Sequence, residues 1–425
     1  MKRKMISFLG PTRYETCEYY LGDVVAKPTE YIQKAIVDIY RNEGIKIDEI
    51  HMLLTPEAKN NNWLGDEKLY DQLQEYVNED KLTIKIHDIS SKQEINTIWN
   101  LFEIIINSIE KEDRIVFDIT HSFRFQPMLA LLSLHFARIT KNILVDGIFY
   151  GVYDPKSAEK KFPIIDLTSF VELQDWITNV YAFIKTGRVE SLSDWLNEKS
   201  KSIQKVERQN AVDAKQVEKL AKSWSELVGS LQTNRSPQLP EVAEEAINSI
   251  ENIKSEMLRP IFNPLNELLS NVEQEIKPLV DNDPIFSGIA AIEWCYNHGL
   301  YQQSYTLADE LVITAICIVQ NWDVKEYSYR KRANDIINEA IKITQRPKEH
   351  ANFLNHEDHE LIKELLQYKE LLKIINKIKD NRNDINHAGW RKNPLKYDKL
   401  EKHFNESFKD YKQHLLKFYK SNLGK

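Results

Sequence analysis

The chain has few of the residues that build covalent or metal-held frameworks. Its 425 residues include only three cysteines, Cys17, Cys295 and Cys317, which are far apart and form no CxxC pair. This spacing supplies neither a disulfide framework nor a cysteine-based zinc site, and it is typical of a protein kept in a reducing environment. We therefore expect a cytoplasmic protein.

Long hydrophobic runs are missing as well. The stretch LVITAICIV, residues 311–319, is among the longest and is too short to cross a bilayer. The apolar run that follows the basic start MKRKMISFLGP is too short for a signal peptide. We therefore expect no membrane segment.

A strong positive charge and the common nucleotide fingerprints are also absent. The net charge of -7 excludes a wholly basic nucleic-acid coat, so any nucleic-acid site must be a local patch. Neither GxGxxG nor GxxxxGK[ST] occurs in the chain. The expected ligand is therefore neither NAD nor a triphosphate bound by a Walker loop.

What the chain does contain is a globular composition, 42% hydrophobic and 28% charged, at a length that predicts two or three domains. In the first 170 residues, short segments rich in Ile, Val, Leu and Phe alternate with longer amphipathic runs. The expected strands are 4–10, 49–55, 82–89, 114–120 and 144–154, with a last strand near Asp166. This alternation predicts an α/β, Rossmann-like domain over residues 1–170, with its ligand beyond the carboxyl ends of the strands.

Helical spacing is clearest in residues 94–110, where one face carries Ile95, Ile98, Trp99, Phe102 and Ile106. After about Val171 the strand signals stop, and an all-α connector is expected over residues 171–285, with two helices broken near Gly187. The polar stretch 207–240 fits either a helical insertion or a connector. A Pro and Asp cluster at 278–286 marks a boundary before an all-α C-terminal domain, residues 286–425.

Polar side chains crowd the end of one expected strand, in IVFDITHSFRFQP, residues 115–127. This cluster contains Asp118, Thr120, His121, Ser122 and Arg124. A single such residue more often satisfies backbone groups at a strand end. A cluster of five, followed by a helix whose positive N-terminus points the same way, favours an anionic ligand.

A second polar loop, FLGPTRYETCEY, follows the first expected strand. Gly10 permits a tight exit from the strand, and Thr12 adds a hydroxyl. Arg13 is suited to pair with phosphate, and Tyr14 is suited to stack on a base. The two loops together predict a site for a phosphate-bearing nucleotide.

The C-terminal region holds a third constellation, KDNRNDINHAGW, with Arg382, Asn383 and His387 ahead of a helix-ending Gly389. A regular helix places Arg382 and His387 about 140° apart, so only a distorted helix end or two copies meeting across a dimer axis would join them. Residues 381–425 carry 11 Lys and Arg against 5 Asp and Glu, an excess of +6. A solvated helix terminus is the simpler alternative.

Three histidines in HANFLNHEDHELI are candidate metal ligands. His356 and His359 are neighbours on a helix, and His350 is close in sequence. No carboxylate or cysteine has a spacing that completes the set, so we expect no metal and no resident cofactor.

Taken in order, these motifs resemble a known family. A first loop FLGxxxY, a strand ending in D-x-T-H and a helical C-terminal region with R-x4-H are similar to the CRISPR-associated DxTHG-motif proteins, which are CARF–HEPN ribonucleases of type III CRISPR systems. The segment NHGLYQQSYTLADE, residues 297–310, is similar to the first helix of that family's HEPN domain. The resemblance covers roughly residues 1–185 and 286–425, and the middle segment has no counterpart in it.

The resemblance implies a CARF sensor that binds a cyclic oligoadenylate at a homodimer interface and a HEPN domain that cuts single-stranded RNA. It assigns the ligand loops to Gly10, Thr12, Arg13, Tyr14, Asp118, Thr120, His121, Ser122, Phe123 and Arg124. It assigns catalysis to Arg382 and His387, with Asn383 beside them. Ser122 stands where the family has glycine, which leaves the ring size of the activator open, although cyclic tetra-adenylate is the expected form.

The expected function is therefore a metal-independent endoribonuclease of antiviral defence, activated by a cyclic oligoadenylate and working as a homodimer or higher oligomer. Two alternatives stay open. The first is a nucleotide-sensing module that binds without cutting RNA. The second is a ring nuclease that degrades its own bound cyclic nucleotide, an activity that could coexist with the ribonuclease.

Overall fold

The computed structural model describes residues 1–92, 94–121, 125–154, 159–206, 211–256, 265–346 and 358–423. The chain divides into two compact units, Met1–Asp175 and Trp176–Lys425. The further division of the second unit near residue 285 stays a prediction. No helix in the described part of the chain is both long and apolar enough to cross a membrane.

The first unit is built on one sheet, which has eight strands within the described residues. The strands are β1 (Arg3–Leu9), β2 (Glu18–Leu21), β3 (Val24–Val25), β4 (Glu49–Leu54), β5 (Thr83–Asp88), β6 (Arg114–Asp118), β7 (Leu144–Gly151) and β8 (Lys161–Asp166). Their spatial order is β3-β2-β8-β7-β6-β1-β4-β5. The six strands expected from the sequence are all present, and the Rossmann-like α/β class is confirmed.

The sheet is mixed rather than wholly parallel. The central strands β5, β4, β1, β6 and β7 run parallel, while β8 is antiparallel to β7, and β2 and β3 extend the edge beyond β8. The strands β2 and β3 were not expected, because four and two residues are too short to show a periodic pattern. In contrast, β4 is buried along its whole length, which explains its nearly continuous apolar sequence.

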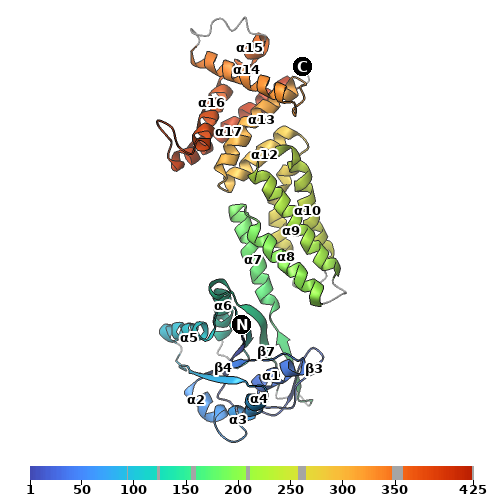
Figure 1. Cartoon of the computed structure of the whole chain (residues 1–425), viewed down its shortest axis with the longest axis vertical. Helices are drawn as coiled ribbons and strands as arrows, with labels where there is room; N and C mark the ends of the chain where they lie inside the picture. Colours follow the sequence, from blue (N-terminus) through green and yellow to red (C-terminus); the bar gives the residue numbers. More distant parts are fainter. Residues whose placement is uncertain are drawn as a thin grey trace. The chain divides into compact units, whose positions relative to one another are not determined.

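Helices cover both faces of this sheet (Figure 1). The helices of the unit are α1 (Ile32–Asn42), α2 (Pro56–Ala58), the π-helical turn η1 (Lys59–Trp63), α3 (Leu69–Gln72), α4 (Gln74–Glu79), α5 (Ile95–Ser108) and α6 (Gln126–Lys141). One core joins α1 and α4 to the sheet through Ile36, Met52 and Tyr76. The opposite core joins α5 and α6 to it through Ile105 and Leu134.

The chain order creates a switch point between β1 and β6. After β1 the chain forms β2 and β3 at the far edge, and the next strands, β4 and β5, lie on one side of β1 whereas β6 and β7 lie on the other. In open α/β sheets, the crevice for a ligand lies at such a point, beyond the carboxyl ends of the strands. The loops that follow β1 and β6 are the two polar loops singled out from the sequence.

The described part of the remaining chain is helical. Its elements are α7 (Ser169–Thr186), α8 (Glu190–Val206), α9 (Ala211–Gln232), η3 (Ser236–Gln238), α10 (Leu239–Glu256), α11 (Leu265–Ile276), η5 (Lys277–Val280), α12 (Pro284–Asn297), α13 (Tyr301–Val319), α14 (Tyr327–Gln345), α15 (His359–Leu365), α16 (Lys369–Asn386) and α17 (Tyr397–Asn422). The break near Gly187 is confirmed, and that residue has a φ of +61°. The polar stretch 207–240 contains the long helix α9, so the helical alternative holds there.

Candidate functional site

The loop after β1 is held by the turn that follows β4. The side-chain amide of Asn62 donates hydrogen bonds to the carbonyls of Gly10, at 2.8 Å, and Thr12, at 2.6 Å. Asn61 donates in the same way to Pro11 at 2.9 Å. Both asparagines belong to the π-helical turn η1, a rare element that is frequent at functional sites. This contact fixes the backbone from which Thr12 and Arg13 project into solvent.

The two polar loops meet through Tyr14 and His121. Their ring centroids are 4.3 Å apart, and the Tyr14 hydroxyl accepts a hydrogen bond from the Gly10 N–H at 2.9 Å. A Cβ on Gly10 would lie 2.6 Å from that hydroxyl, so glycine is required by the close approach. Burial lowers the pKa of His121 to about 4, and its Nε2 is buried with no hydrogen-bond partner among the described residues.

Asp118 lies beneath this site rather than in it. Its side chain has no exposed surface; one carboxylate oxygen accepts from Ser7 Oγ at 2.6 Å, and the other from Thr120 Oγ1 at 2.6 Å. Burial raises the pKa of this carboxyl, although the hydrogen bonds from Ser7 and Thr120 offset part of the rise. Thr120 Oγ1 also accepts from the Gly151 N–H at 2.8 Å. We therefore interpret Asp118 as a positioning residue that holds the loop after β6.

The structure brings together seven of the ten expected ligand residues at the switch point: Gly10, Thr12, Arg13, Tyr14, Asp118, Thr120 and His121. Ser122, Phe123 and Arg124 lie outside the described residues. A cavity of about 230 Å³ opens at the carboxyl end of β5, between α5 and the start of α6. Its polar lining includes Ser90, Lys92 and Asn100. None of these three residues was predicted from the sequence to bind a ligand.

In the second unit, Arg382 is anchored to a buried carboxylate. Its Nη1 donates to Asp309 Oδ2 at 2.8 Å, and Lys379 Nζ lies 2.9 Å from the other oxygen of the same carboxylate. Asp309 is 2% exposed and belongs to α13, whereas both cations belong to α16. The arrangement fixes the position of the Arg382 guanidinium.

His387 caps the end of α16. The helix closes with hydrogen bonds from the Ala388 N–H to the Ile385 carbonyl, at 2.9 Å, and from the Gly389 N–H to the Asp384 carbonyl, at 3.1 Å. Ala388 and Gly389 both have positive φ, of +51° and +74°. This is a Schellman ending, and it leaves the His387 side chain exposed.

The helix is regular up to Asn386, so the distorted helix end considered from the sequence is not found. Among the described residues, the hydrogen bond of the Arg382 guanidinium goes to Asp309 and not to His387. Asn383 is exposed on the same turn. Of the three histidines weighed as metal ligands, His350 and His356 lie outside the described residues, and His359 pairs with Glu360 at 3.0 Å.

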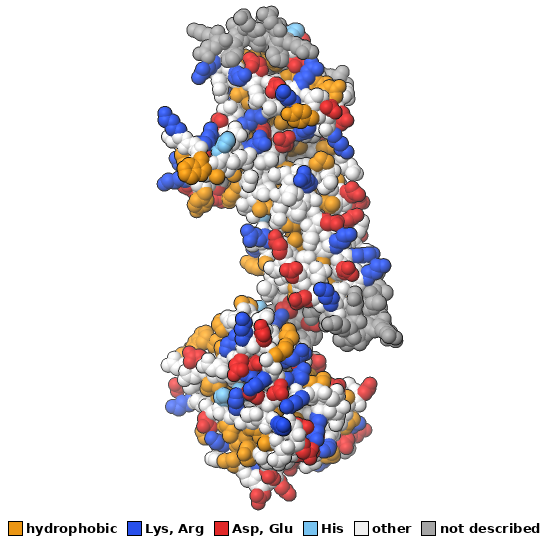
Figure 2. Space-filling view, viewed as in Figure 1, with side chains coloured by type: hydrophobic (Ala, Val, Ile, Leu, Met, Phe, Trp, Pro, Cys, Tyr) orange, Lys and Arg blue, Asp and Glu red, His pale blue; other side chains and the backbone are white. Residues whose placement is uncertain are grey.

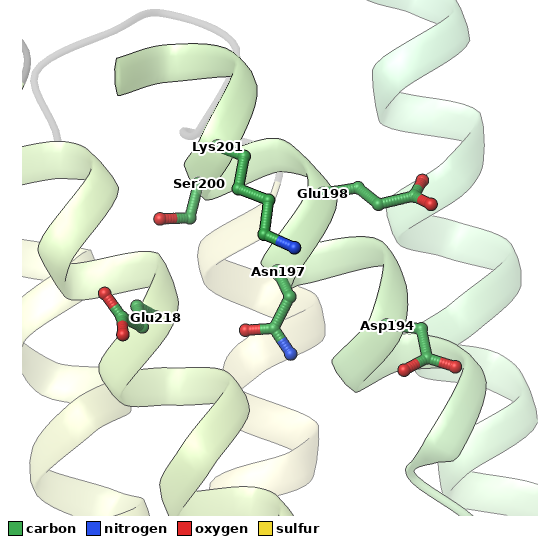
Figure 3. Close-up of a pocket in the computed structure, with 6 residues that line it drawn as sticks. All are labelled: Asp194, Asn197, Glu198, Ser200, Lys201 and Glu218. Carbon is green, nitrogen blue, oxygen red and sulfur yellow. The ribbon is translucent and has the colours of Figure 1, made fainter. Parts of the chain in front are cut away.

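Another cavity, of about 590 Å³, lies between α8 and α9 (Figure 3). Its lining residues are Asp194, Asn197, Glu198, Ser200, Lys201 and Glu218. Three carboxylates against one ammonium group would repel a phosphate-bearing ligand. We therefore do not assign the nucleotide site to this cavity.

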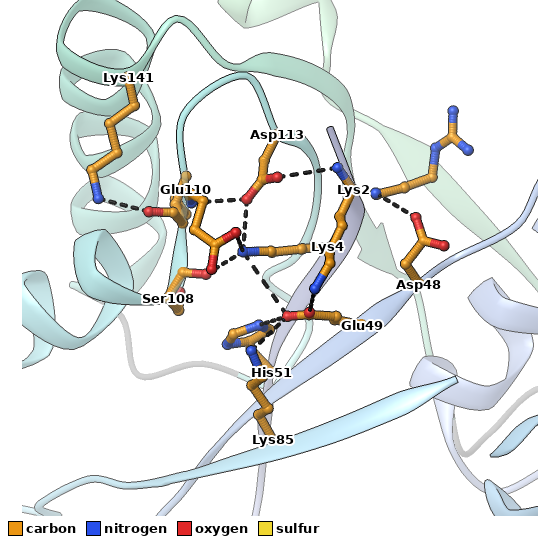
Figure 4. Close-up of polar contacts among 12 residues, drawn as sticks. Lys2, Lys4, Asp48, Glu49, His51, Lys85, Ser108, Glu110, Asp113 and Lys141 are labelled. Carbon is orange, nitrogen blue, oxygen red and sulfur yellow. Dashed lines mark hydrogen bonds and ion pairs between the residues drawn. The ribbon is translucent and has the colours of Figure 1, made fainter. Parts of the chain in front are cut away.

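An ionic network centred on the buried Glu49 carboxylate lies at the amino-terminal ends of the strands, opposite the ends that carry the ligand loops (Figure 4). Glu49 accepts from Lys2 at 2.6 Å, from Lys85 at 2.8 Å and from His51 at 3.1 Å. Burial opposes ionisation of Glu49, but these hydrogen bonds outweigh it and lower its pKa to about 2. Lys4 is fully buried and pairs with Asp113 at 2.7 Å. The network stabilises the base of the sheet.

Comparison with known proteins decides the family of the first unit. Residues 4–154 match the family model described as CRISPR system endoribonuclease Csx1, CARF domain. CRISPR-associated protein MJ1674 from Methanocaldococcus jannaschii is 26% identical over 234 residues. Residues 4–154 therefore form a CARF domain, and the two matches support a CRISPR-associated protein that contains it. The aligned region is 54% of this chain and 33% of the relative, so the chain matches about a third of that protein's length.

Residues 172–280 match the model for the second domain of CRISPR-associated protein MJ1674. The middle segment therefore resembles the second domain of that relative. The family resemblance found in the sequence motifs had no counterpart for this segment. Neither matched range includes Arg382 or His387. The HEPN assignment accordingly stays a prediction.

The CARF domain carries an unpartnered apolar face on α5 and α6. Ile95 and Trp99 on α5 are 66% and 59% exposed, and Met128, Leu132 and Phe136 on α6 are 71%, 57% and 45% exposed. These α6 residues recur every four positions, which places them on one side of the helix. Because Leu101 and Ile105 form the buried side of α5, the helix has apolar side chains on two faces, and one of them meets solvent in a single copy.

Proposed function

We propose that this protein is a metal-independent, single-stranded RNA endoribonuclease of type III CRISPR defence, activated by a cyclic oligoadenylate bound to its CARF domain. The proposal joins the two sites described above. The CARF loops supply the sensor, and the end of α16 supplies the chemistry.

The sensor assignment is supported by the position and chemistry of the loops. Arg13 projects from a rigid loop at the switch point, and Tyr14 and His121 present rings beside it. A guanidinium suits a phosphodiester, and aromatic rings suit adenine bases. The matched family model names a CRISPR endoribonuclease, which agrees with a sensor coupled to RNA cleavage.

The observation that carries the ribonuclease assignment is the anchoring of Arg382 on the same helix that ends at His387. A guanidinium fixed by a buried carboxylate is held in one place, yet its side chain keeps 29% of its surface exposed. It can therefore contact a substrate phosphate without a large ordering cost. His387 lies at the open helix end, within a region that carries a basic excess of +6 over residues 381–425.

The proposed reaction uses the nucleophile that RNA itself contains. His387 takes the proton of a 2′-hydroxyl, and the 2′-oxygen attacks the adjacent phosphorus. The bond from phosphorus to the 5′-oxygen breaks, which leaves a 2′,3′-cyclic phosphate and a 5′-oxygen that takes a proton from water to become a hydroxyl, while His387 releases its proton to solvent. Arg382 stabilises the charge that develops on the phosphate, and Asn383 orients either group. The protons balance without a metal or a cofactor.

Two features of the chain support the proposal of a homodimer. The exposed apolar side chains of α5 and α6 form one face that a second copy would bury. The helix α6 begins just after the ligand loop that follows β6. A second copy seated on this face would place two sets of loops around one cyclic ligand. Two copies would also let Arg382 of one chain meet His387 of the other, since one regular helix does not join them.

The test is a fluorogenic RNA cleavage assay on the full chain with cyclic tri-, tetra- and hexa-adenylate. We expect one ring size to activate cleavage, products ending in a 2′,3′-cyclic phosphate, and unchanged rates in EDTA. His387→Ala should abolish cleavage while leaving ligand binding intact, because the CARF loops are untouched. A His387→Ala variant that cuts at the wild-type rate refutes the assignment.

The same assay separates the two alternatives. A pure binding module would bind cyclic adenylate and cut no RNA under any condition. A ring nuclease would convert the cyclic ligand to linear adenylates, detected by chromatography. Strong inhibition by EDTA would point to a metal enzyme.

A further inference from the structure

The loop between α16 and α17 is held rigidly although it projects from the helical unit. The buried Asp384 carboxylate accepts from the Leu395 N–H at 2.9 Å, which ties the far side of the loop back to α16. Arg391 Nη1 donates to the Asp380 carbonyl at 2.9 Å and lies 3.9 Å from Asp384. The Trp390 N–H bonds to the His387 carbonyl at 2.9 Å. The loop therefore has a defined shape.

This anchored loop presents large aromatic side chains to solvent. Trp390 is 91% exposed and Tyr397, at the start of α17, is 77% exposed. Tryptophan is usually well buried, so a rigid loop that leaves one almost fully exposed needs an explanation. Trp390 is only three residues from His387.

Positive charge surrounds these aromatic side chains. Arg391, Lys392, Lys396 and Lys399 are all exposed, against one acidic residue, Asp398, in residues 390–399. Figure 2 shows hydrophobic side chains on the protruding loop between α16 and α17, with Lys and Arg side chains around them. Aromatic rings interleaved with cations are what single-stranded nucleic acid requires, because each nucleotide brings one flat base and one phosphate.

We propose that Trp390, with Tyr397, is a base-stacking platform that binds the RNA substrate beside His387. Resting on the ribonuclease function proposed above, this inference adds the element that holds the strand. A base stacked on Trp390 and phosphates paired with Arg391 and Lys392 would present the neighbouring phosphodiester to the catalytic pair. The contact is to a base face, so it tolerates any base.

The experiment measures RNA affinity in the His387→Ala background, which keeps the RNA intact. Fluorescence anisotropy with a labelled 12-nucleotide RNA gives the Kd of that chain with and without Trp390→Ala. Losing one stacked base should weaken binding roughly tenfold, and Trp390→Phe should restore most of it. The matched control is Tyr327→Ala, since Tyr327 is 77% exposed at the start of α14 in the same unit and should leave Kd unchanged.

A second RNA distinguishes stacking from charge. Replacing the bases by abasic sites should weaken binding to the chain with Trp390 and have no further effect on Trp390→Ala. Equal affinities of the intact RNA for the chains with and without Trp390→Ala would overturn the inference. The ribonuclease proposal would not be affected, because the cleavage assay of His387→Ala tests it separately. A Trp390→Ala variant that becomes monomeric in light scattering would also overturn it, because the exposed ring would then serve a second copy of the chain.

Discussion

The anchoring of Arg382 by Asp309 makes a sharp prediction about Asp309→Asn. The substitution keeps the size and shape of the side chain and removes its charge. Asp309 is 2% exposed and binds two cations, Arg382 at 2.8 Å and Lys379 at 2.9 Å. The variant therefore leaves both cations without a compensating charge.

The expected loss in the free energy of unfolding depends on how deeply the three charged side chains are buried. Breaking a fully buried ion pair costs about 3–5 kcal/mol. The Arg382 and Lys379 side chains keep 29% and 16% of their surface in water, which reduces the expected loss to about 2–3 kcal/mol. In a unit of about 250 residues, this lowers Tm by roughly 4–12 °C.

The catalytic effect should be larger than the structural one. A guanidinium released from its anchor samples many positions, and a displacement of about 1 Å in a catalytic group costs on the order of 100-fold in rate. We expect kcat for RNA cleavage to fall by about that factor with KM little changed, because Asp309 itself does not touch the substrate.

The matched control is Glu310→Gln, the same chemical change one residue further along α13. Glu310 pairs with Arg330 at 2.7 Å and its side chain is 42% exposed, so this substitution should cost less than about 1 kcal/mol and leave kcat unchanged. The reasoning fails if Asp309→Asn matches this control in both Tm and kcat.

The other predictions concern the CARF domain. Leu132→Asp or Phe136→Asp should convert the proposed dimer to a folded monomer in light scattering and weaken cyclic adenylate binding, since both side chains are exposed in one copy. An intact dimer would contradict the assigned face. Burial holds the pKa of His51 and of His121 at about 4, below the ordinary 6.5, so the unfolded chain binds more protons as the pH falls. Urea unfolding should therefore show stability lost between pH 6.5 and 4, by up to about 1.4 kcal/mol per pH unit for each histidine, and an unchanged slope in His121→Gln would contradict this.

Local patterns in the sequence were sufficient for most of the secondary structure. Strand and helix periodicities depend on a few neighbouring residues. The central strands and the helix break near Gly187 were therefore predictable from the local sequence pattern alone. The loops after β1 and β6 were predicted to lie side by side, because the carboxyl ends of parallel strands meet on the same side of a sheet. The strands β2 and β3 escaped prediction because they carry too few residues for a period.

The partners of each site residue depended on the tertiary structure. Asp309 lies 73 positions before Arg382, and Asn62 lies 52 positions after Gly10, so no spacing in the sequence connects them. The direction of Asp118 was equally hidden, because a strand buried on both faces shows no alternation that separates an inward side chain from an outward one.

The sequence by itself thus determined the order of strands and helices, the two polar loops and the Arg382–His387 motif, because these depend on nearest neighbours along the chain. Only the tertiary structure decided that Asp118 is buried and holds the loop after β6, and that Arg382 pairs with Asp309 rather than with His387. It also decided that α5 and α6 leave an apolar face exposed. Those outcomes depend on which distant surfaces exclude water together, and hydrophobic burial acts on surfaces in space whatever their separation in sequence.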